Sequence, residues 1–415
     1  MTELPDTQQA AAAEPGRKSR RKPALADAIN VYDVREKARW LPRSVFDAID
    51  GGAGEEVTLR ANTSAFDDIW FRPRSLVDVS VRDTSTTVLG HRVSMPLLLA
   101  PCGMARVANS KAELAVARAA GDAGTIFVVS HASSYPLEEV AAAATGPLWY
   151  QLYLQGNRDE TARVLERVEA AGYDVLCVTI DEPIAAKRER DLRNNLSIPL
   201  KMTPATLMTG LSNPRWAMDF VLGNVGRGKG HGNYRMALTS VHRFASIVRS
   251  LTSVTADDVS WLRERWSGKL VLKGVMRADE CEEMVALGAD ALVVSNHGGR
   301  CIDGTRPSIE VLPEVVDAVG GRVEILMDGG VRRGSHVVKA LALGASAVLA
   351  GRPYMFGLAA AGEAGVARVL EIFHTEIEQT MGLLGAPTVA DIEPSLIELP
   401  ANSPGWGRTR RCVPS

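Results

Sequence analysis

Eight short apolar runs, separated by amphipathic segments, constrain the fold of this chain more than any other feature. The runs are residues 96–101, 125–131, 148–153, 175–181, 269–274, 291–297, 324–330 and 347–352. Apolar residues at helical spacing occur between and after them, as in residues 158–171 and 365–384. Runs without polar alternation are typical of parallel strands that are covered on both faces. Eight strand and helix units predict an α/β fold, a closed (β/α)8 barrel, with a doubly wound open sheet as the alternative.

The 415-residue chain exceeds the roughly 250 residues of a minimal barrel, so extra segments are expected. Residues 1–28 contain a basic patch and little apolar surface, which predicts a disordered tail. Residues 29–399 are expected to form the barrel domain, in which residues 31–94 supply helices and a small hairpin that close its bottom. A long loop, residues 182–268, follows the fourth strand. Residues 400–415 are expected to form a C-terminal arm that packs on a neighbouring subunit.

Composition excludes several classes of protein. The net charge of −2 and the hydrophobic content of 46% argue against a nucleic-acid surface and against global disorder. No apolar stretch reaches membrane-spanning length, and the N-terminus has no signal-peptide core. The five cysteines have neither a pairing motif nor metal-ligand spacing, so we expect reduced thiols, no metal and a cytoplasmic location.

Polar side chains gather where the apolar runs end. They are Ser130, Gln151, Tyr153, Thr179, Asp181, Lys273, Ser295, His297 and Asp328. The carboxyl ends of barrel strands meet at one mouth, and the starts of these runs carry little that could react. A set drawn from across the sequence and focused on one face is therefore expected to be an active site.

The segment Ser-Asn-His-Gly-Gly-Arg at 295–300 places a histidine and an arginine in one glycine turn. Histidine can take a proton near neutral pH, and arginine presents a fixed cation that suits a carboxylate. The pair could therefore hold an acid and deprotonate it. The structural alternative is a strand-to-helix turn with a surface arginine and a histidine bonded to backbone.

Two later loops predict a phosphate site. Residues 328–334 lead from the seventh run into a helix, and residues 351–353 lie at the end of the eighth run. Both loops combine glycine with arginine. Barrels commonly bind phosphate after strands seven and eight, where helix N-termini supply amide donors. Tight turns with solvated arginines are the alternative. Neither a GxGxxG that opens a βαβ unit nor a P-loop motif occurs, so a separate nucleotide domain is not expected.

Together these segments resemble the family of FMN-dependent L-2-hydroxy-acid oxidases and dehydrogenases, nearest to its lactate and mandelate dehydrogenase branch. The resemblance covers about residues 30–399 and includes YQLY at 150–153, the TID and RERD of 179–191, SNHGGR and MDGGVRRG. It implies FMN as the cofactor. The expected contacts of the flavin ring and ribityl chain are Ser130, Gln151, Thr179, Lys273 and Ser295. The expected ribityl and phosphate contacts are Asp328, Gly329, Gly330, Arg332, Gly351 and Arg352, and the backbone of Pro101, Cys102 and Gly103 would lie against the reactive nitrogen of the flavin.

The resemblance also implies catalytic roles. His297 would be the base and Asp181 its charge partner. Arg300 and Arg188 would bind the substrate carboxylate, and Tyr153 would donate to the hydroxyl oxygen of the substrate. Lys273 would stabilise the anionic reduced flavin. Proton abstraction from the substrate carbon and hydride transfer would both use this layout.

Two departures from the family concern the substrate pocket, whose expected residues are Ala48, Ala132, Tyr153, Arg188, His297 and Arg300. Family members usually carry a tyrosine that holds the substrate carboxylate, and here Ala48 stands at that place. Ala132 stands where glycolate-oxidising relatives have tryptophan. A roomy pocket and a bulky, aromatic or long-chain L-2-hydroxy acid are therefore expected, unless neighbouring loops fill the space.

The loop after the fourth strand mixes apolar and basic residues between 196 and 235, which is typical of a segment that lies on an anionic membrane surface. Its segment 213–221 resembles the corresponding loop of membrane-associated mandelate and lactate dehydrogenases, and an active-site lid is the alternative. Relatives that use oxygen as the electron acceptor often carry alanine where this chain has Gly103, which favours a dehydrogenase only weakly. Quinone and oxygen therefore both stay open as the electron acceptor. The resemblance implies a homotetramer, and we expect a cytoplasmic protein that is peripheral on the inner face of the cell membrane.

Two further functions stay open. The missing tyrosine at Ala48 is compatible with a flavin-binding barrel that has lost hydroxy-acid activity, although His297, Asp181, Lys273, Arg188 and Arg300 are all retained. A related flavoenzyme acts on a peptide-derived or amine substrate and lacks the arginine matched by Arg300. Arg300 therefore favours a substrate with a free carboxylate.

Overall fold

A computed structural model of the chain describes residues 25–194, 204–222 and 253–400. Eight parallel strands close into a barrel in chain order, with the last strand beside the first. They are β4 (Leu97–Leu99), β5 (Phe127–Ser130), β6 (Leu148–Leu152), β7 (Val175–Thr179), β8 (Lys269–Val275), β9 (Ala291–Val294), β10 (Glu324–Met327) and β11 (Ala347–Ala350). Every predicted run coincides with one strand, although β8 extends one residue beyond its run, and the closed barrel is confirmed over the open sheet.

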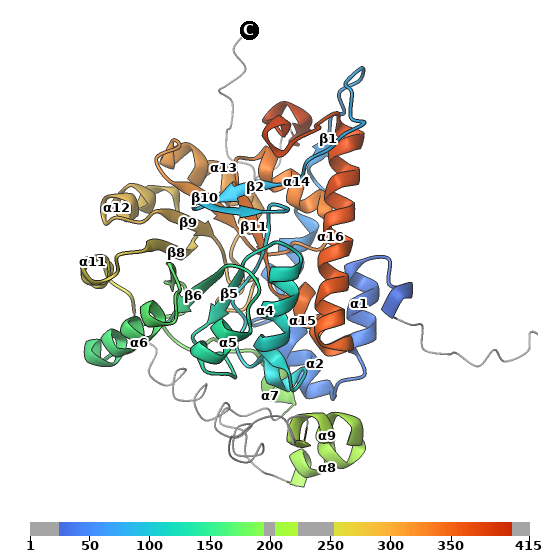
Figure 1. Ribbon diagram of the computed structural model, residues 1–415, viewed down its shortest axis with the longest axis vertical. Coiled ribbons are helices and arrows are strands. Elements are labelled where there is room, and N and C mark those ends of the chain that lie inside the picture. The colour runs from blue at the N-terminus through green and yellow to red at the C-terminus, as the bar shows by residue number, and fades with distance from the viewer. Residues whose placement is uncertain (1–24, 195–203, 223–252, 401–415) are drawn as a thin grey trace, which may run out of the picture.

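Helices surround the barrel (Figure 1). They are α4 (Ala112–Asp122), α5 (Leu137–Ala143), α6 (Arg158–Ala170), α11 (Ala256–Arg265), α12 (Cys281–Ala286), α13 (Ser308–Val319), α14 (Gly334–Ala342), α15 (Arg352–Ala361) and α16 (Glu363–Leu384). The Asn157 side chain caps α6 by accepting from the Asp159 amide, and α16 ends at Gly385 in the left-handed region. Both predicted amphipathic segments are therefore helices.

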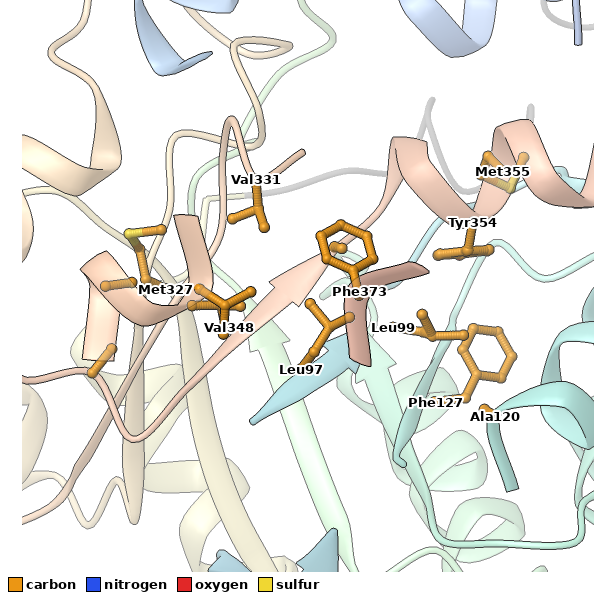
Figure 2. Close-up of a cluster of buried hydrophobic side chains, with 14 of the residues drawn as sticks. Leu97, Leu99, Ala120, Phe127, Met327, Val331, Val348, Tyr354, Met355 and Phe373 are labelled. Atoms are coloured by element: carbon orange, nitrogen blue, oxygen red, sulfur yellow. The ribbon is translucent and has the colours of Figure 1, made fainter. Parts of the chain in front are cut away.

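Successive residues of each strand serve two cores. Leu98, Trp149 and Leu326 belong to the cluster inside the barrel. Leu97 and Leu99, on either side of Leu98, belong to the cluster between the strands and the outer helices, which also contains Phe127, Tyr354 and Phe373 (Figure 2). Because neighbouring strand residues point to opposite faces, a run can be buried on both faces only when it is apolar throughout.

The N-terminal region divides between the two ends of the barrel. The strands β2 (Thr86–Val88) and β3 (His91–Val93) form the expected hairpin, and the Leu89 amide donates to Glu324 Oε1 at 2.9 Å, at the start of β10. The hairpin therefore closes the bottom. A two-stranded pairing of β1 (Trp70–Phe71) with β12 (Ile397–Glu398) joins this region to the C-terminal end of the described chain.

The helices of this region do not close the bottom, so that part of the expectation was wrong. They are α1 (Val31–Ala38), α2 (Arg43–Asp50) and α3 (Val57–Ser64), which follow the short 3-10 helix η1 (Leu25–Asp27). Arg300 and Arg352 donate to the carbonyls of Ala48, Ile49 and Gly51 at the end of α2. The free carbonyls of a helix end attract cations, so α2 is held at the carboxyl mouth. In Figure 1 the hairpin lies above the strands and α2 below them.

The long segment after β7 contains α7 (Glu189–Arg193), α8 (Pro204–Ser212) and α9 (Pro214–Leu222) before α11. Residues 195–203 and 223–252 lie outside the described residues, as do 1–24 and 401–415, so the expected tail, the C-terminal arm and most of the basic loop are not described. The described chain already packs on the barrel at Ala28, which is buried and accepts from Arg368. Among the described residues, no helix is long and apolar enough to span a membrane.

Candidate functional site

A cavity of about 400 Å³ opens at the carboxyl ends of the barrel strands. The predicted site residues that line it are Ala48, Pro101, Cys102, Gly103, Ser130, Ala132, Tyr153, Arg188, Lys273, His297, Arg300, Asp328, Gly329, Gly330, Arg332, Gly351 and Arg352. The other four, Gln151, Thr179, Asp181 and Ser295, lie directly behind this lining through hydrogen bonds to it or to one another. The structure therefore brings every predicted site residue to one place.

His297 and Asp181 form a close pair at the centre of the cavity wall. His297 Nδ1 lies 3.0 Å from Asp181 Oδ1, which leaves the Nε2 edge toward the cavity. Burial opposes a charge on this imidazole, but attraction from Cys301 and Asp181 outweighs it, so the pKa of His297 is raised well above its ordinary value. His297 also has a backbone φ of 57°, in the left-handed region, where a residue with a side chain is strained. The fold maintains this conformation where the imidazole meets Asp181.

Buried hydrogen bonds organise the strand ends beneath the cavity. Ser130 Oγ donates to Gln151 Oε1 at 3.1 Å, and Gln151 Nε2 donates to Thr179 Oγ1 at 3.0 Å, so three strands share one chain of bonds. Lys273 Nζ donates to Ser295 Oγ at 2.9 Å and pairs with Asp328 Oδ2 at 2.9 Å. Asp328 Oδ1 is buried without a hydrogen-bond partner in the described part of the chain. This acceptor suits a hydroxyl-bearing group such as a ribityl chain.

One end of the cavity concentrates positive charge. Arg332 and Arg352 both line it, and Arg352 donates to the carbonyls of Ile49, Gly51 and Gly298. Burial lowers the pKa of Arg352 well below its usual value, and the charges of Arg300 and Arg332 lower it further. Within the described chain, neither Arg332 nor Arg352 forms an ion pair with a carboxylate. Buried guanidiniums without carboxylate partners favour a phosphate, so these residues fit the phosphate of FMN.

The glycines of this end have a packing role that the sequence did not indicate. Gly330 has a φ of 77°, and a Cβ there would overlap the backbone oxygen of Asn62 on α3. At Gly329, with φ of 99°, a Cβ would press on Ser308 Oγ of α13. Glycine at these positions is therefore required by the approach of helices to the loop, whatever the loop binds.

The other end of the cavity holds the residues expected to bind the substrate. Arg300 donates through Nη1 to the carbonyls of Ala48 and Gly51 at 3.0 and 2.9 Å, and burial lowers its pKa to about 10. Arg188 Nε donates to the Arg300 carbonyl at 3.3 Å, so the two guanidiniums belong to one assembly. Ala48 and Ala132 both line the cavity.

Sequence reasoning missed Glu182, which lines this same end. Its Oε1 accepts from Arg188 Nη2 at 2.8 Å, and its Oε2 accepts from the Tyr153 hydroxyl at 3.1 Å. The same Oε2 lies 3.7 Å from His297 Nε2. Its position directly after Asp181 at a strand end was the available signal.

Asp191 and Cys301 were also missed. Asp191 lines the cavity, and its charge interacts with Arg300 and Arg188. The thiol of Cys301, one carboxylate oxygen of Asp181 and one ring nitrogen of His297 all lie within 4.8 Å of one another. Two separate loops create this grouping, so the spacing of cysteines in the sequence could not indicate it.

The helix α9 is docked beside the cavity by polar contacts. Trp216 Nε1 donates to the carbonyl of Val107, which lines the cavity, at 2.8 Å. Asp219 accepts from the amide and the hydroxyl of Ser110, both at 2.8 Å. Met208, Leu211 and Met218 on α8 and α9 remain 60%, 75% and 61% exposed. These two helices therefore present apolar side chains to the surroundings.

Comparisons with known proteins agree with this geometry. The sequence profile described as FMN-dependent dehydrogenase matches residues 37–399. The chain is 40% identical to an L-lactate oxidase of Nostoc sp., over 91% of this chain and 100% of that protein. It is 38% identical to an (S)-mandelate dehydrogenase of Pseudomonas putida, over 89% of this chain and 94% of that protein. Among solved structures, a monotopic membrane protein described as (S)-mandelate dehydrogenase superposes with a TM-score of 0.83 at 37% identity, covering 90% of this chain and 100% of that chain.

Proposed function

The chain belongs to the FMN-dependent dehydrogenase family and is an FMN-dependent 2-hydroxy-acid oxidoreductase, and on that premise we propose that it oxidises a bulky L-2-hydroxy acid to the 2-oxo acid. The observation that carries the proposal is the His297 and Asp181 pair at 3.0 Å, which faces a cavity with Arg188 and Arg300 in its wall. A base with a fixed charge partner and two guanidiniums for a carboxylate is what oxidation of such an acid requires. The related mandelate dehydrogenase and mandelate oxidase structures support a bulky substrate.

The cofactor would be held by residues from both the strand ends and the phosphate end. Ser130, Gln151, Thr179, Lys273 and Ser295 would hold the ring and the start of the ribityl chain. Asp328, Gly329, Gly330, Arg332, Gly351 and Arg352 would hold the remainder, with the backbone of Pro101, Cys102 and Gly103 against the ring. When bound, FMN supplies the acceptor for the two electrons of the substrate.

The protein residues would then divide the remaining work. Arg188 and Arg300 would bind the substrate carboxylate, and Tyr153 would donate to the hydroxyl oxygen. His297 Nε2 would take a proton from the substrate, and Asp181 would stabilise the resulting imidazolium across the 3.0 Å contact. Lys273, which is buried and cationic, would offset negative charge that develops on the cofactor side.

A panel of acids tests the function and the size of the pocket together. The purified yellow protein would be mixed anaerobically with glycolate, L-lactate, a long-chain L-2-hydroxy acid and (S)-mandelate, and bleaching of the flavin followed. Bulky acids should reduce the flavin most efficiently. The Ala48→Tyr variant should shift the preference toward small acids, because its phenol would fill space and supply a carboxylate donor. If no hydroxy acid bleaches the flavin of the wild type, the proposed function is wrong.

The exposed apolar side chains of α8 and α9 support a further part of the proposal, which is peripheral attachment to a membrane and electron transfer to a quinone rather than to oxygen. Met208, Leu211 and Met218 would enter the interfacial region of the bilayer, as an amphipathic surface segment does. A variant with serine at these three positions should float less with anionic vesicles than the wild type, and a variant with serine at exposed Leu383 on α16 is the matched control. Equal flotation of wild type and triple variant would support the alternative, a lid. The proposed assembly is a homotetramer, which size-exclusion chromatography with light scattering would test.

A further inference from the structure

Glu182 places a carboxylate among the groups proposed to act on the substrate. It accepts hydrogen bonds from Arg188 and Tyr153, and its Oε2 lies 3.7 Å from the His297 nitrogen proposed to take the proton. Its side chain is only 10% exposed, so its charge is poorly screened by water. A buried carboxylate this close to the reacting atoms must affect which substrates can bind.

The substrate end already contains carboxylates of the protein without a ligand. Arg188 pairs with Glu182, and the charge of Asp191 attracts Arg300, although burial and the charge of Arg188 lower the pKa of Arg300 to about 10. The third carboxylate, Asp181, pairs with His297 when the imidazole is protonated. Once His297 is neutral, as a base must be, the three carboxylates outnumber the two guanidiniums. A simple hydroxy acid would add a further negative charge to this low-dielectric cavity, whereas a zwitterion would add none.

Small side chains share the cavity with Glu182. Ala48 and Ala132 are small and face the same cavity, which also receives the side chains of Ala185 and Ala186. An α-hydroxyl that donates to His297 Nε2 lies within about 3 Å of it. Because Glu182 Oε2 is 3.7 Å from that nitrogen, an ammonium group bonded to Glu182 would stand a few bonds from the oxidised carbon. The distance therefore suits a nitrogen on the side chain of the same acid.

We propose that Glu182 selects a 2-hydroxy acid whose side chain carries a protonated amine close to the hydroxyl-bearing carbon. This inference rests on the proposed function, because it specifies the substrate class of the same pocket. The carboxylate of the substrate would bind Arg300, and its ammonium group would bind Glu182, where it would share or replace the contacts of Arg188 and Tyr153. The amine is a recognition group and is not oxidised.

The test uses two matched pairs of ligands. The reactive pair is L-4-amino-2-hydroxybutanoate and L-2-hydroxypentanoate, which differ by an ammonium in place of a methyl group. The inert pair is 4-aminobutanoate and pentanoate, which lack the hydroxyl and report binding alone. Flavin reduction and calorimetric affinity would be measured for the wild-type holoenzyme, for Glu182→Gln and for Glu189→Gln. Glu189 is a matched control because it is a carboxylate of the same segment that pairs with Arg193 and Lys187 and does not itself line the cavity.

The wild type should prefer the amino member of each pair, and Glu182→Gln should reduce that preference about tenfold or more, the scale of one charge-assisted hydrogen bond. Glu189→Gln should leave the preference unchanged. If the ratio of affinities for the amino and the methyl member of a pair is the same in wild type and Glu182→Gln, the proposal is overturned. An equal gain in affinity for both members also overturns it, because Glu182 would then only obstruct the pocket. If the inert pair shows the Glu182-dependent preference while no hydroxy acid reduces the flavin, the recognition stands and the proposed oxidation fails.

Discussion

Replacement of Asp181 by asparagine tests the electrostatic basis of the proposed base. The substitution keeps the size of the side chain and a hydrogen-bonding group near His297 but removes the negative charge 3.0 Å from Nδ1. In the wild type the pKa of His297 is raised, so the imidazole is protonated below that pKa and cannot act as a base there. The rate of flavin reduction should therefore rise with pH through the pKa of His297. In Asp181→Asn that rise should occur at lower pH, because the imidazolium is less stabilised.

The magnitude follows from the separation and the burial of the pair. At 3.0 Å, two unit charges attract by about 1.4 kcal/mol in water and about 5.5 kcal/mol at an effective dielectric constant of 20. The side chains of His297 and Asp181 are 18% and 11% exposed, so the value lies between these limits. Opposite charges at such distances typically shift a pKa by about 1 to 3 units, equivalent to about 1.4 to 4 kcal/mol. The pH at which the rate of flavin reduction rises (the acid limb of the pH profile) should move down by that number of pH units. The maximal rate at high pH (the plateau) should fall about tenfold or more, because the neutral imidazole is a weaker base.

Anaerobic stopped-flow measurement of flavin reduction between pH 5 and 10, at saturating and limiting substrate, gives the limb and the plateau. The flavin spectrum before mixing reports whether the variant retains cofactor. Asp279→Asn is the control, since Asp279 is an exposed carboxylate that pairs with Arg277 and does not line the cavity, and its profile should match the wild type. An acid limb that stays in place or moves upward in a flavin-loaded Asp181→Asn variant would refute the reasoning.

Three other substitutions have defined outcomes. Lys273→Met should lower the midpoint potential of the bound flavin and also destabilise the apoprotein by about 3 to 5 kcal/mol, because Asp328 loses its buried partner, and spectroelectrochemistry and thermal melting check both effects. Arg352→Met should raise the dissociation constant of FMN about tenfold or more, measured by quenching of flavin fluorescence, through the loss of a charged donor to the phosphate. Phe373→Ala should lower the free energy of unfolding by about 3 to 5 kcal/mol in denaturant titrations, because it leaves a cavity between α16 and the strands. For each of the three variants, a value unchanged from the wild type would contradict the contact on which the prediction depends.

The sequence predicted the barrel well because the local signal and the tertiary environment agree. Each strand is covered on both faces, so residues such as Leu97, Leu98 and Leu99 are all apolar, and periodicity and burial give the same answer. The position of α2 could not be predicted in this way. It depends on hydrogen bonds from Arg300 and Arg352 to the carbonyls at the end of the helix, and these partners lie about 250 to 300 residues away in sequence.

The candidate site was predictable where a residue ends a strand. His297, Lys273 and Asp328 follow or end apolar runs, and barrel geometry alone brings them to one mouth. Glu182 also follows a strand, but its significance lies in the contacts of its side chain with Tyr153 and Arg188, which the spacing of residues does not specify. The family pattern indicated the small residues Ala48 and Ala132 but not the carboxylate of Glu182.

The two ends of the cavity differ in how their charges are matched, and this difference distinguishes the two ligands. At one end Arg332 and Arg352 are buried and form no ion pair with a carboxylate in the described chain, and burial lowers the pKa of both more than the charge of Asp50 raises it, so an anion relieves an existing electrostatic cost. At the other end Arg188 already has Glu182, and Arg300 has Asp191 nearby, so an added anion must compete with carboxylates that belong to the fold. The first arrangement favours tight retention of a phosphate-bearing cofactor. The second would favour selective and reversible binding of the substrate proposed above, whose own charges are balanced.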